Sequence, residues 1–226
     1  MIPWVQLGKA TVPDGGGELR LMQRGDEFAI MAGSTSLMTS RRTGSEETLG
    51  RLGCERLRTR KQPRILIGGL GVAFTLRAAL NALGPDATVV VAELVPEVVA
   101  WAKGPMREVF GDTLTDPRVT IVVQDVAKVI AAASSEYDAI LLDVDNGPEG
   151  LTRKANDKIY DHQGLRAARV ALRARGILAV WSSGPDPRFT QRLKRSGFDV
   201  EEVKARANGS RGGAWHMIWM ATSTAT

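Results

Sequence analysis

Glycines and acidic residues follow several short apolar runs of the chain, and their types and spacing suit nucleotide binding. Gly68, Gly69 and Gly71 come after one such run, and Glu93 ends the next. Glycine lets the backbone approach a ligand without a Cβ, and a carboxylate can accept both hydroxyls of a ribose. The acid follows the glycines by roughly 20 residues, which is typical of a nucleotide-binding βαβ unit. Because Phe74 replaces the third glycine of G-x-G-x-x-G, the turn disfavours NAD and favours an adenosyl-type ligand.

Two further apolar runs, 119–123 and 137–142, also end in polar residues. Those residues are Asp125, Asp143, Asp145 and Asn146. In open α/β sheets ligands bind at the carboxyl ends of the strands, so the set predicts one ligand site. Asp125 alone could cap the next helix. As a member of the set, Asp125, with Val126 beside it, is expected to contact the adenine, and 143–146 to face a sulfonium carbon.

An acid beside a sulfonium could orient, desolvate or deprotonate an amine nucleophile, which must be neutral to attack. The sulfonium is already an activated leaving group, so positioning supplies most of the rate. The predicted co-substrate is S-adenosylmethionine or its decarboxylated form, and the predicted acceptor is a small molecule.

The elements that position these residues predict an α/β fold. From residue 64 onward apolar runs alternate with helical patterns, which predicts a Rossmann-like, mostly parallel sheet of the class I methyltransferase type. The segments 198–205 and 214–221 predict a carboxy-terminal antiparallel hairpin. One predicted helix covers 161–175 and is ended by Gly176. Residues 43–226 form the expected catalytic domain.

Residues 1–42 are expected to form a small β-meander that serves as an oligomer interface, a lid over the site, or both. The next segment, 45–58, is predicted to be a helix. Ser45 would cap it, and Glu46 and Glu47 would be surface acids in its first turn.

Composition indicates a globular protein of 226 residues with a net charge of +5. The basic residues are scattered, so no nucleic-acid partner is expected. No apolar run is long enough to span a membrane, and the single cysteine, Cys54, suits a reducing compartment, so a cytoplasmic location is expected. Two histidines and one cysteine predict no metal site. His216 is interpreted as a packed histidine, and Trp181 as core or pocket wall.

The chain resembles the spermidine and spermine synthases, the aminopropyltransferases of the class I S-adenosylmethionine-dependent fold. Residues 65–77 look like their I-G-G-G-D-G-G-x-x-R segment, and Tyr160 matches a tyrosine that precedes their next helix. The resemblance implies Glu93 for the ribose, Asp125 for the adenine, an amine acceptor and a homodimer. Glu46 and Glu47 fall where the family has a tyrosine-histidine-glutamate segment.

The chain also departs from the family. Val72 replaces an aspartate that helps to bind the aminopropyl amine, and the D-S-S-D motif reads Asp143-Val144-Asp145-Asn146. Arg153 and Lys154 would repel a diamine. These changes suit intact S-adenosylmethionine or an acceptor that bears an acid.

Three functions remain open. The first is transfer of an aminopropyl-type group to an amine, with Asp143, Asp145, Asn146 and Tyr160 as the catalytic residues. The second is methyl transfer to a small molecule, which Val72 favours. The third is a non-catalytic protein that binds an adenosyl ligand.

Overall fold

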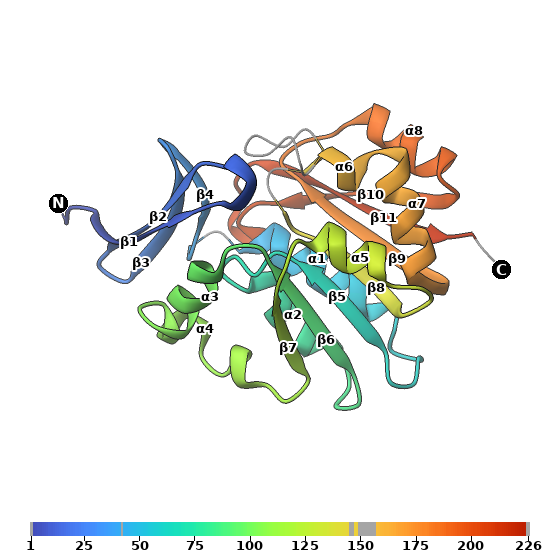
Figure 1. Ribbon diagram of the computed structural model, residues 1–226, viewed down its shortest axis with the longest axis horizontal. Coiled ribbons are helices and arrows are strands. Elements are labelled where there is room, and N and C mark those ends of the chain that lie inside the picture. Colours follow the sequence, from blue (N-terminus) through green and yellow to red (C-terminus); the bar gives the residue numbers. More distant parts are fainter. Residues whose placement is uncertain (1, 42, 145–146, 149–156, 225–226) are drawn as a thin grey trace.

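The chain forms two sheets, a small amino-terminal one and a large one that carries most of the helices (Figure 1). The computed structural model describes residues 2–41, 43–144, 147–148 and 157–224. The predicted α/β fold is confirmed.

The amino-terminal sheet has four antiparallel strands in the order β1-β2-β3-β4. They are β1 (Val5–Thr11), β2 (Glu18–Arg24), β3 (Glu27–Ala32) and β4 (Thr35–Thr39). The meander predicted within residues 1–42, with strands at 18–24, 27–31 and 36–38, corresponds to β2, β3 and β4, whereas β1 was not predicted. Leu19 and Leu21 alternate with more exposed neighbours along β2, and they pack against the large sheet's helical layer.

The large sheet has seven strands in the order β10-β11-β9-β8-β5-β6-β7. The strands are β5 (Arg64–Gly68), β6 (Thr88–Glu93), β7 (Val119–Val123), β8 (Tyr137–Leu142), β9 (Leu172–Ser182), β10 (Phe198–Arg206) and β11 (Trp215–Ser223). Strands β5 to β9 pair in parallel, and β10 and β11 form the predicted antiparallel hairpin beside β9. The strand order reverses between β5 and β8, and ligands of open α/β sheets bind at such a switch point.

Helices cover both faces of the large sheet (Figure 1). They are α1 (Gly44–Glu55), α2 (Phe74–Ala82), α3 (Pro96–Lys103), α4 (Arg107–Phe110), α5 (Val126–Ala132), α6 (Asp157–Tyr160), α7 (His162–Ala171) and α8 (Pro187–Arg195). Because side chains alternate along a strand, Ile65 and Ile67 pack with α1 to α3, and Leu66 packs with α5, α7 and α8. The core therefore consists of two apolar layers.

The predicted helix over 161–175 is too long. The structure ends α7 earlier and begins β9 at Leu172, so the predicted stop at Gly176 is wrong. Arg173 donates to the buried carboxylate of Asp138 on β8 at 2.8 Å, and the register between β8 and β9 shifts at this point. Pairing with β8, to which this ion pair belongs, thus overrides a locally helical pattern.

Glycines in α1 allow its backbone to lie very close to α2 and to the turn between β10 and β11. A Cβ on Gly50 would lie 2.3 Å from the carbonyl oxygen of Thr75 in α2, and one on Gly44 would lie 1.9 Å from the backbone nitrogen of Gly209 in the β10–β11 turn. The amino-terminal end of α1 is thus held at the carboxyl end of the sheet, where the predicted ligand site lies.

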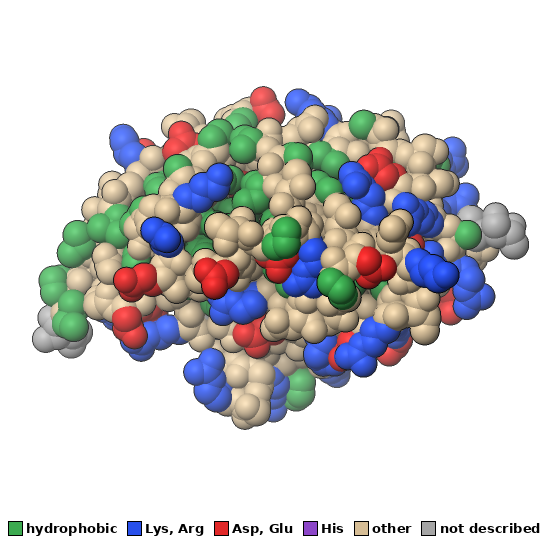
Figure 2. All heavy atoms as spheres, turned by 90° about the horizontal axis from the view of Figure 1, so that it is seen from below, with side chains coloured by type: hydrophobic (Ala, Val, Ile, Leu, Met, Phe, Trp, Pro, Cys, Tyr) green, Lys and Arg blue, Asp and Glu red, His purple; other side chains and the backbone are tan. Residues whose placement is uncertain are grey.

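Charged side chains of both signs are interspersed over the face shown in Figure 2. This agrees with the scattered basic residues of the sequence. In the part of the chain that the structure describes, no helix has both the length and the apolar character needed to cross a membrane.

Candidate active site

The glycine turn after β5 passes between the ends of two neighbouring strands. Gly69 has a φ of +91°, and a Cβ there would lie 2.6 Å from the carbonyl oxygen of Asp143, after β8. Its N–H donates to the carbonyl of Ala92 in β6 at 2.9 Å. A residue with a side chain would be strained and would collide, so glycine alone fits this position. Gly68, which was also predicted to bind the ligand, is packed against Val126 and lines neither of the cavities described below.

Glu93 ends β6, and its side chain is 8% exposed. Its two carboxylate oxygens accept from backbone N–H groups, Oε2 from Leu70 at 3.0 Å and Oε1 from Val95 at 2.9 Å. Burial raises the pKa of this carboxyl above its ordinary value, although the backbone donors lower it in part. Because each oxygen has two lone pairs, Glu93 keeps acceptor capacity for the hydroxyls of a ligand.

Asp125 serves as the amino-terminal cap of α5, because its Oδ1 accepts from the N–H of Ala127 at 2.9 Å. The capping role that the sequence allowed is therefore real. The same residue also lines a cavity at the strand ends together with Val126, which is buried. Among the described residues nothing donates to its Oδ2, so capping and ligand binding are compatible.

The strand ends enclose a cavity of about 140 Å³, which we call the donor cavity. The predicted binding residues around it are Gly69, Gly71, Glu93, Asp125, Val126 and Asp143. Leu19 of β2 and Leu37 and Met38 of β4 form another part of the wall. The amino-terminal sheet therefore closes one side of the cavity, as the predicted lid would.

A second cavity of about 110 Å³, which we call the acidic cavity, adjoins the first. The two share the lining residues Leu37, Met38, Gly71 and Asp143. Asp143 therefore lies between them, and its Oδ2 accepts from the hydroxyl of Thr75 at 2.7 Å. Burial raises the pKa of Asp143 to about 6.

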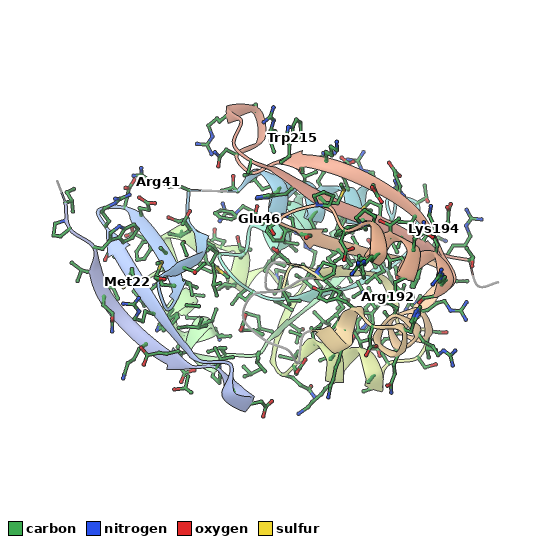
Figure 3. The ribbon with its side chains drawn as sticks, turned by 90° about the horizontal axis from the view of Figure 1, so that it is seen from above. Met22, Arg41, Glu46, Arg192, Lys194 and Trp215 are labelled. Carbon is green, nitrogen blue, oxygen red and sulfur yellow. The ribbon has the colours of Figure 1, made fainter. Side chains whose placement is uncertain are left out.

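Glu46 lines the acidic cavity together with residues of the glycine turn. Figure 3 shows it at the amino-terminal end of α1, between the sheet that carries Met22 and the hairpin that carries Trp215. Burial, followed by the negative charge of Asp143, raises the pKa of Glu46 to about 7. Of the two interpretations that the sequence left open for Glu46, the surface acid is therefore wrong, whereas Glu47 is exposed.

Ser45 does not cap α1, which corrects another prediction. The helix begins one residue earlier, and the Ser45 hydroxyl lies 2.6 Å from Oε2 of Glu46 and 2.9 Å from Nδ1 of His216. The ring of His216 packs edge-on against Trp181, with centroids 4.8 Å apart. His216 is thus packed, as interpreted, and it supports both the serine beside Glu46 and the indole that lines the cavity.

The structure does not bring Tyr160 to either cavity. Its side chain is 1% exposed, its ring packs edge-on against Phe189, and its hydroxyl donates to the carbonyl oxygen of Val144 at 3.4 Å. The predicted catalytic residues Asp145 and Asn146 lie outside the described residues, as do Arg153 and Lys154.

Other chemically active residues lie away from this site. Cys54 is fully buried, and burial raises the pKa of its thiol to about 12, so it is inert. Within the described ranges, no three histidine, cysteine or acidic side chains are grouped so that they could hold a metal ion. A larger groove of about 480 Å³ lies between α1 and α2, and Arg51 and Arg58 in its wall pair with Glu55 at 3.1 and 3.9 Å.

Comparison with known proteins gives one curated relative and several solved structures with a similar fold. The chain is 28% identical over 121 residues to the polyamine aminopropyltransferase of Korarchaeum cryptofilum, a match that covers 54% of the chain and 36% of that protein. No family model matches the chain. The chain thus aligns with about a third of the length of the curated relative.

Solved structures give the fold. The spermidine synthase of Thermotoga maritima aligns with a TM-score of 0.71 at 15% identity, covering 96% of this chain and 72% of that one. The chain has the spermidine synthase fold. A spermidine synthase in complex with the transition-state analogue AdoDATO aligns with a TM-score of 0.76 at 16% identity, over 96% and 73% of the two chains. A probable spermidine synthase from Corynebacterium glutamicum aligns with a TM-score of 0.63 at 16% identity, over 100% and 81%. The fold that the resemblance implied is confirmed.

The sequence did not identify the parts of the site that come from distant segments. Thr75, the β4 side chains and the inward position of Glu46 were all missed as site features. The coincidence of Glu46 with a family motif was the one signal that could have revealed it.

Proposed function

We propose that the chain is an aminopropyltransferase that uses decarboxylated S-adenosylmethionine and a small amine acceptor. The observation that carries the proposal is the buried carboxylate of Glu93, which lines a cavity shared by the glycine turn and Asp143. The sequence similarity to a polyamine aminopropyltransferase supports the same reaction.

In the proposed complex the adenosyl group occupies the donor cavity. Glu93 accepts from the ribose hydroxyls, Asp125 accepts from the adenine amino group, and Val126 contacts the base. The glycine turn passes along the sugar and the sulfur substituents. These roles suit the residue types, because carboxylates accept hydrogen bonds and the turn exposes its backbone.

The acidic cavity supports the decarboxylated donor over intact S-adenosylmethionine. We place the donor's tail in this cavity, beside Glu46 and Asp143, whose pKa values are already raised by burial. A third carboxylate beside them would be repelled. The sequence departure at Val72 suggested the intact donor, and the position of Glu46 argues against that suggestion.

The reaction is a displacement at carbon. The lone pair of a neutral amine forms a bond to the propyl carbon next to sulfur, and the carbon–sulfur bond breaks with its electron pair moving to sulfur. The products are the alkylated ammonium, which then loses a proton, and neutral methylthioadenosine. Asp143, between the two cavities, is placed to orient the amine and accept that proton.

Several predicted features stay proposals. Asp145 and Asn146 are proposed to assist Asp143 at the reacting centre. Tyr160 is proposed to support the segment after β8 through its hydrogen bond to Val144. A homodimer in the cytoplasm remains our expectation. Exposed apolar side chains at the amino-terminal end, Ile2, Val5 and Leu7, are consistent with a dimer interface.

The test is product analysis with each donor and 1,4-diaminobutane. We expect methylthioadenosine from the decarboxylated donor. S-adenosylhomocysteine from the intact donor would instead demonstrate methyl transfer, which the comparisons do not support. Binding without either product would indicate the non-catalytic alternative.

Asp143→Asn tests the catalytic assignment. The amide oxygen can keep the hydrogen bond from Thr75 but cannot accept a proton, so we expect kcat to fall about 100-fold or more. Asp199→Asn, on the exposed side of β10, is the control that should keep full activity.

A further inference from the structure

Helices α7 and α8 carry basic side chains and no acidic ones. Together they hold six lysine and arginine residues, whereas the whole chain has a net charge of +5, so the rest of the chain has a net charge of −1. The six residues, which we call the basic face, are Arg166, Arg169, Arg188, Arg192, Lys194 and Arg195. Basic residues that are scattered along the sequence are thus concentrated on one pair of helices.

The two helices lie beside each other and pack into the same apolar layer of the large sheet (Figure 1). The ring nitrogen Nδ1 of His162, at the start of α7, lies 3.3 Å from the hydroxyl oxygen of Ser196, at the end of α8. A Cβ on Gly197 would lie 2.6 Å from a guanidinium nitrogen of Arg169, so this α7 side chain reaches the end of α8. The six charges therefore belong to one region of the surface.

Two residues of the basic face have structural contacts. Arg169 packs against Gly197, and Nη1 of Arg192 donates to the carbonyl oxygen of Tyr160 at 3.1 Å. Both side chains are half-buried. The other four are exposed, and the structure gives their side chains no hydrogen bond or ion pair with a described residue; they are Arg166, Arg188, Lys194 and Arg195. These four are free to contact a partner.

Some of these charges stand where an isolated helix would not favour them. Arg188 precedes Arg192 by four residues, and like charges at this spacing repel on a helix. Arg188 also lies in the first turn of α8, where the helix dipole disfavours a cation. By contrast, α1 pairs its arginine at the same spacing with an acid, Arg51 with Glu55 at 3.1 Å. The dipole accounts only for the basic residues in the last turn of α8.

The acids close to the two helices are engaged elsewhere. Asp161 and Asp186 cap α7 and α8 by accepting from backbone N–H groups at 2.8 Å. Glu202 of β10 accepts from the hydroxyl of Thr190 in α8. Across the described ranges, no carboxylate forms an ion pair with the basic face. The positive charge is therefore available to an anionic partner.

The side chains present fit a row of phosphates on a duplex. Five of the six are arginines, whose planar fork matches phosphate oxygens. Single-stranded nucleic acid would call for exposed aromatic rings on which bases stack, but Phe189 is fully buried and the two helices hold no other phenylalanine, tyrosine or tryptophan. A membrane surface would call for exposed apolar side chains, and Val170 is the one large apolar residue that these helices expose.

We infer that the basic face binds the phosphate backbone of double-stranded nucleic acid without reading its sequence. Figure 3 shows Arg192 and Lys194 on the opposite side of the molecule from the amino-terminal sheet, which carries Met22. No residue of α7 or α8 lines the donor cavity or the acidic cavity. The binding surface is thus separate from both cavities, and the inference does not depend on the proposed reaction.

The probe is a labelled duplex of about 20 base pairs and mixed sequence, prepared as DNA and as RNA. We expect dissociation constants of roughly 1–100 μM at physiological salt, because contacts to phosphate alone give affinities of this order. The logarithm of the binding constant should fall against the logarithm of the salt concentration with a slope of about −3 or steeper, since each phosphate contact adds about −0.9.

The test variant combines Arg188→Gln, Lys194→Gln and Arg195→Gln. It removes three exposed charges from α8 and leaves the structural contacts of Arg169 and Arg192 in place. Glutamine is a good helix former, so α8 should persist. We expect duplex binding to weaken at least tenfold and the salt slope to become shallower by about two to three.

The matched control combines Lys61→Gln, Lys103→Gln and Arg107→Gln. It removes the same charge from exposed positions outside the two helices. Because distant charges are screened by salt, its affinity should stay within about threefold of the wild type. Arg188→Lys with Arg195→Lys, which keeps the charge, should retain most of the binding.

Four results would overturn the inference. One is equal weakening by the test and control variants, which would make net charge the cause. Another is the absence of binding to either duplex, and a third is a wild-type affinity that does not change with salt, both of which are measured without any variant. The fourth is binding to polyglutamate or to phosphatidylserine vesicles as tight as binding to the duplex, which would point to an acidic protein or a membrane. If the triple variant fails to fold, Arg188→Gln alone should still weaken binding about threefold, and an unchanged affinity would contradict the assignment.

Discussion

The donor cavity and the acidic cavity share a wall but treat their carboxylates in opposite ways. Glu93 in the donor cavity accepts from two backbone N–H groups, so the fold itself stabilises its position. Glu46 and Asp143 in the acidic cavity have hydroxyl partners, Ser45 and Thr75, but no positive charge among the described lining residues. One acid is held by two backbone donors, whereas the other pair has no lysine or arginine beside it among the described lining residues.

Of the variants that test this difference between the cavities, Glu93→Gln should have the largest effect on ligand affinity. A glutamine offers one oxygen, so either Leu70 or Val95 would face its NH₂ group, and the ribose would lose a charged acceptor. We expect affinity for methylthioadenosine to fall about 10- to 100-fold.

A chemical control makes the test specific to the ribose. The wild type should bind the 2′-deoxy analogue of methylthioadenosine more weakly than the parent compound, and Glu93→Gln should discriminate less. Equal discrimination by both proteins would contradict the ribose role. Glu97→Gln, on an exposed position of α3, should behave as the wild type.

Gly69→Ala should affect both cavities through the backbone they share. The new Cβ would collide with the carbonyl oxygen of Asp143 in a left-handed conformation, so we expect a loss of about 1–3 kcal/mol in the free energy of unfolding. For a chain of this size each kcal/mol lowers the unfolding temperature by roughly 2–4 °C.

Gly212→Ala is the matched control for that measurement. Gly212 has a φ of +89°, and no atom lies within 4 Å of where its Cβ would stand. The two variants share the backbone strain and differ in the collision. Equal losses of stability would show that the close approach to Asp143 is unimportant.

The pH dependence of stability should show the smallest effect and should come from the acidic cavity. The raised pKa values mean that the folded state binds more protons than the unfolded state between about pH 4 and pH 7. Stability from these groups is therefore present at low pH and is lost as the pH rises through that window. Glu46→Gln should become more stable relative to the wild type by on the order of 1–2 kcal/mol between pH 5 and pH 8.

Thermal unfolding of the two proteins across that pH range measures the difference. Glu93 contributes to both proteins alike and cancels. If the difference in stability between the two proteins stays constant with pH, the surroundings of Glu46 do not raise its pKa.

The contrast between the cavities also explains what the sequence could predict. Strand ends follow from apolar runs, so Glu93, Asp125 and Asp143 could be assigned to one edge of the sheet before the structure was known. The acidic cavity depends on where α1 lies, and this depends on the close packing of Gly50 against α2. No local pattern reveals such a contact, and Glu46 therefore had the pattern of a surface acid.

The same reasoning applies to the errors in the fold. The helical pattern through residue 175 is local, whereas the Arg173–Asp138 ion pair that extends β9 joins residues on different strands. The strand β1 was missed because its side chains are mostly exposed and it shows no apolar alternation.

The most direct test of the whole account is a calorimetric comparison of decarboxylated and intact S-adenosylmethionine. Both share the adenosyl group, so both should use Glu93, but only the intact donor brings a carboxylate toward Glu46 and Asp143. The account predicts that the decarboxylated form binds clearly more tightly than the intact donor. Methylthioadenosine, which lacks the amine, should bind more weakly than the decarboxylated form. Tighter binding of the intact donor would contradict the proposed reaction, and binding of neither would contradict the donor cavity itself.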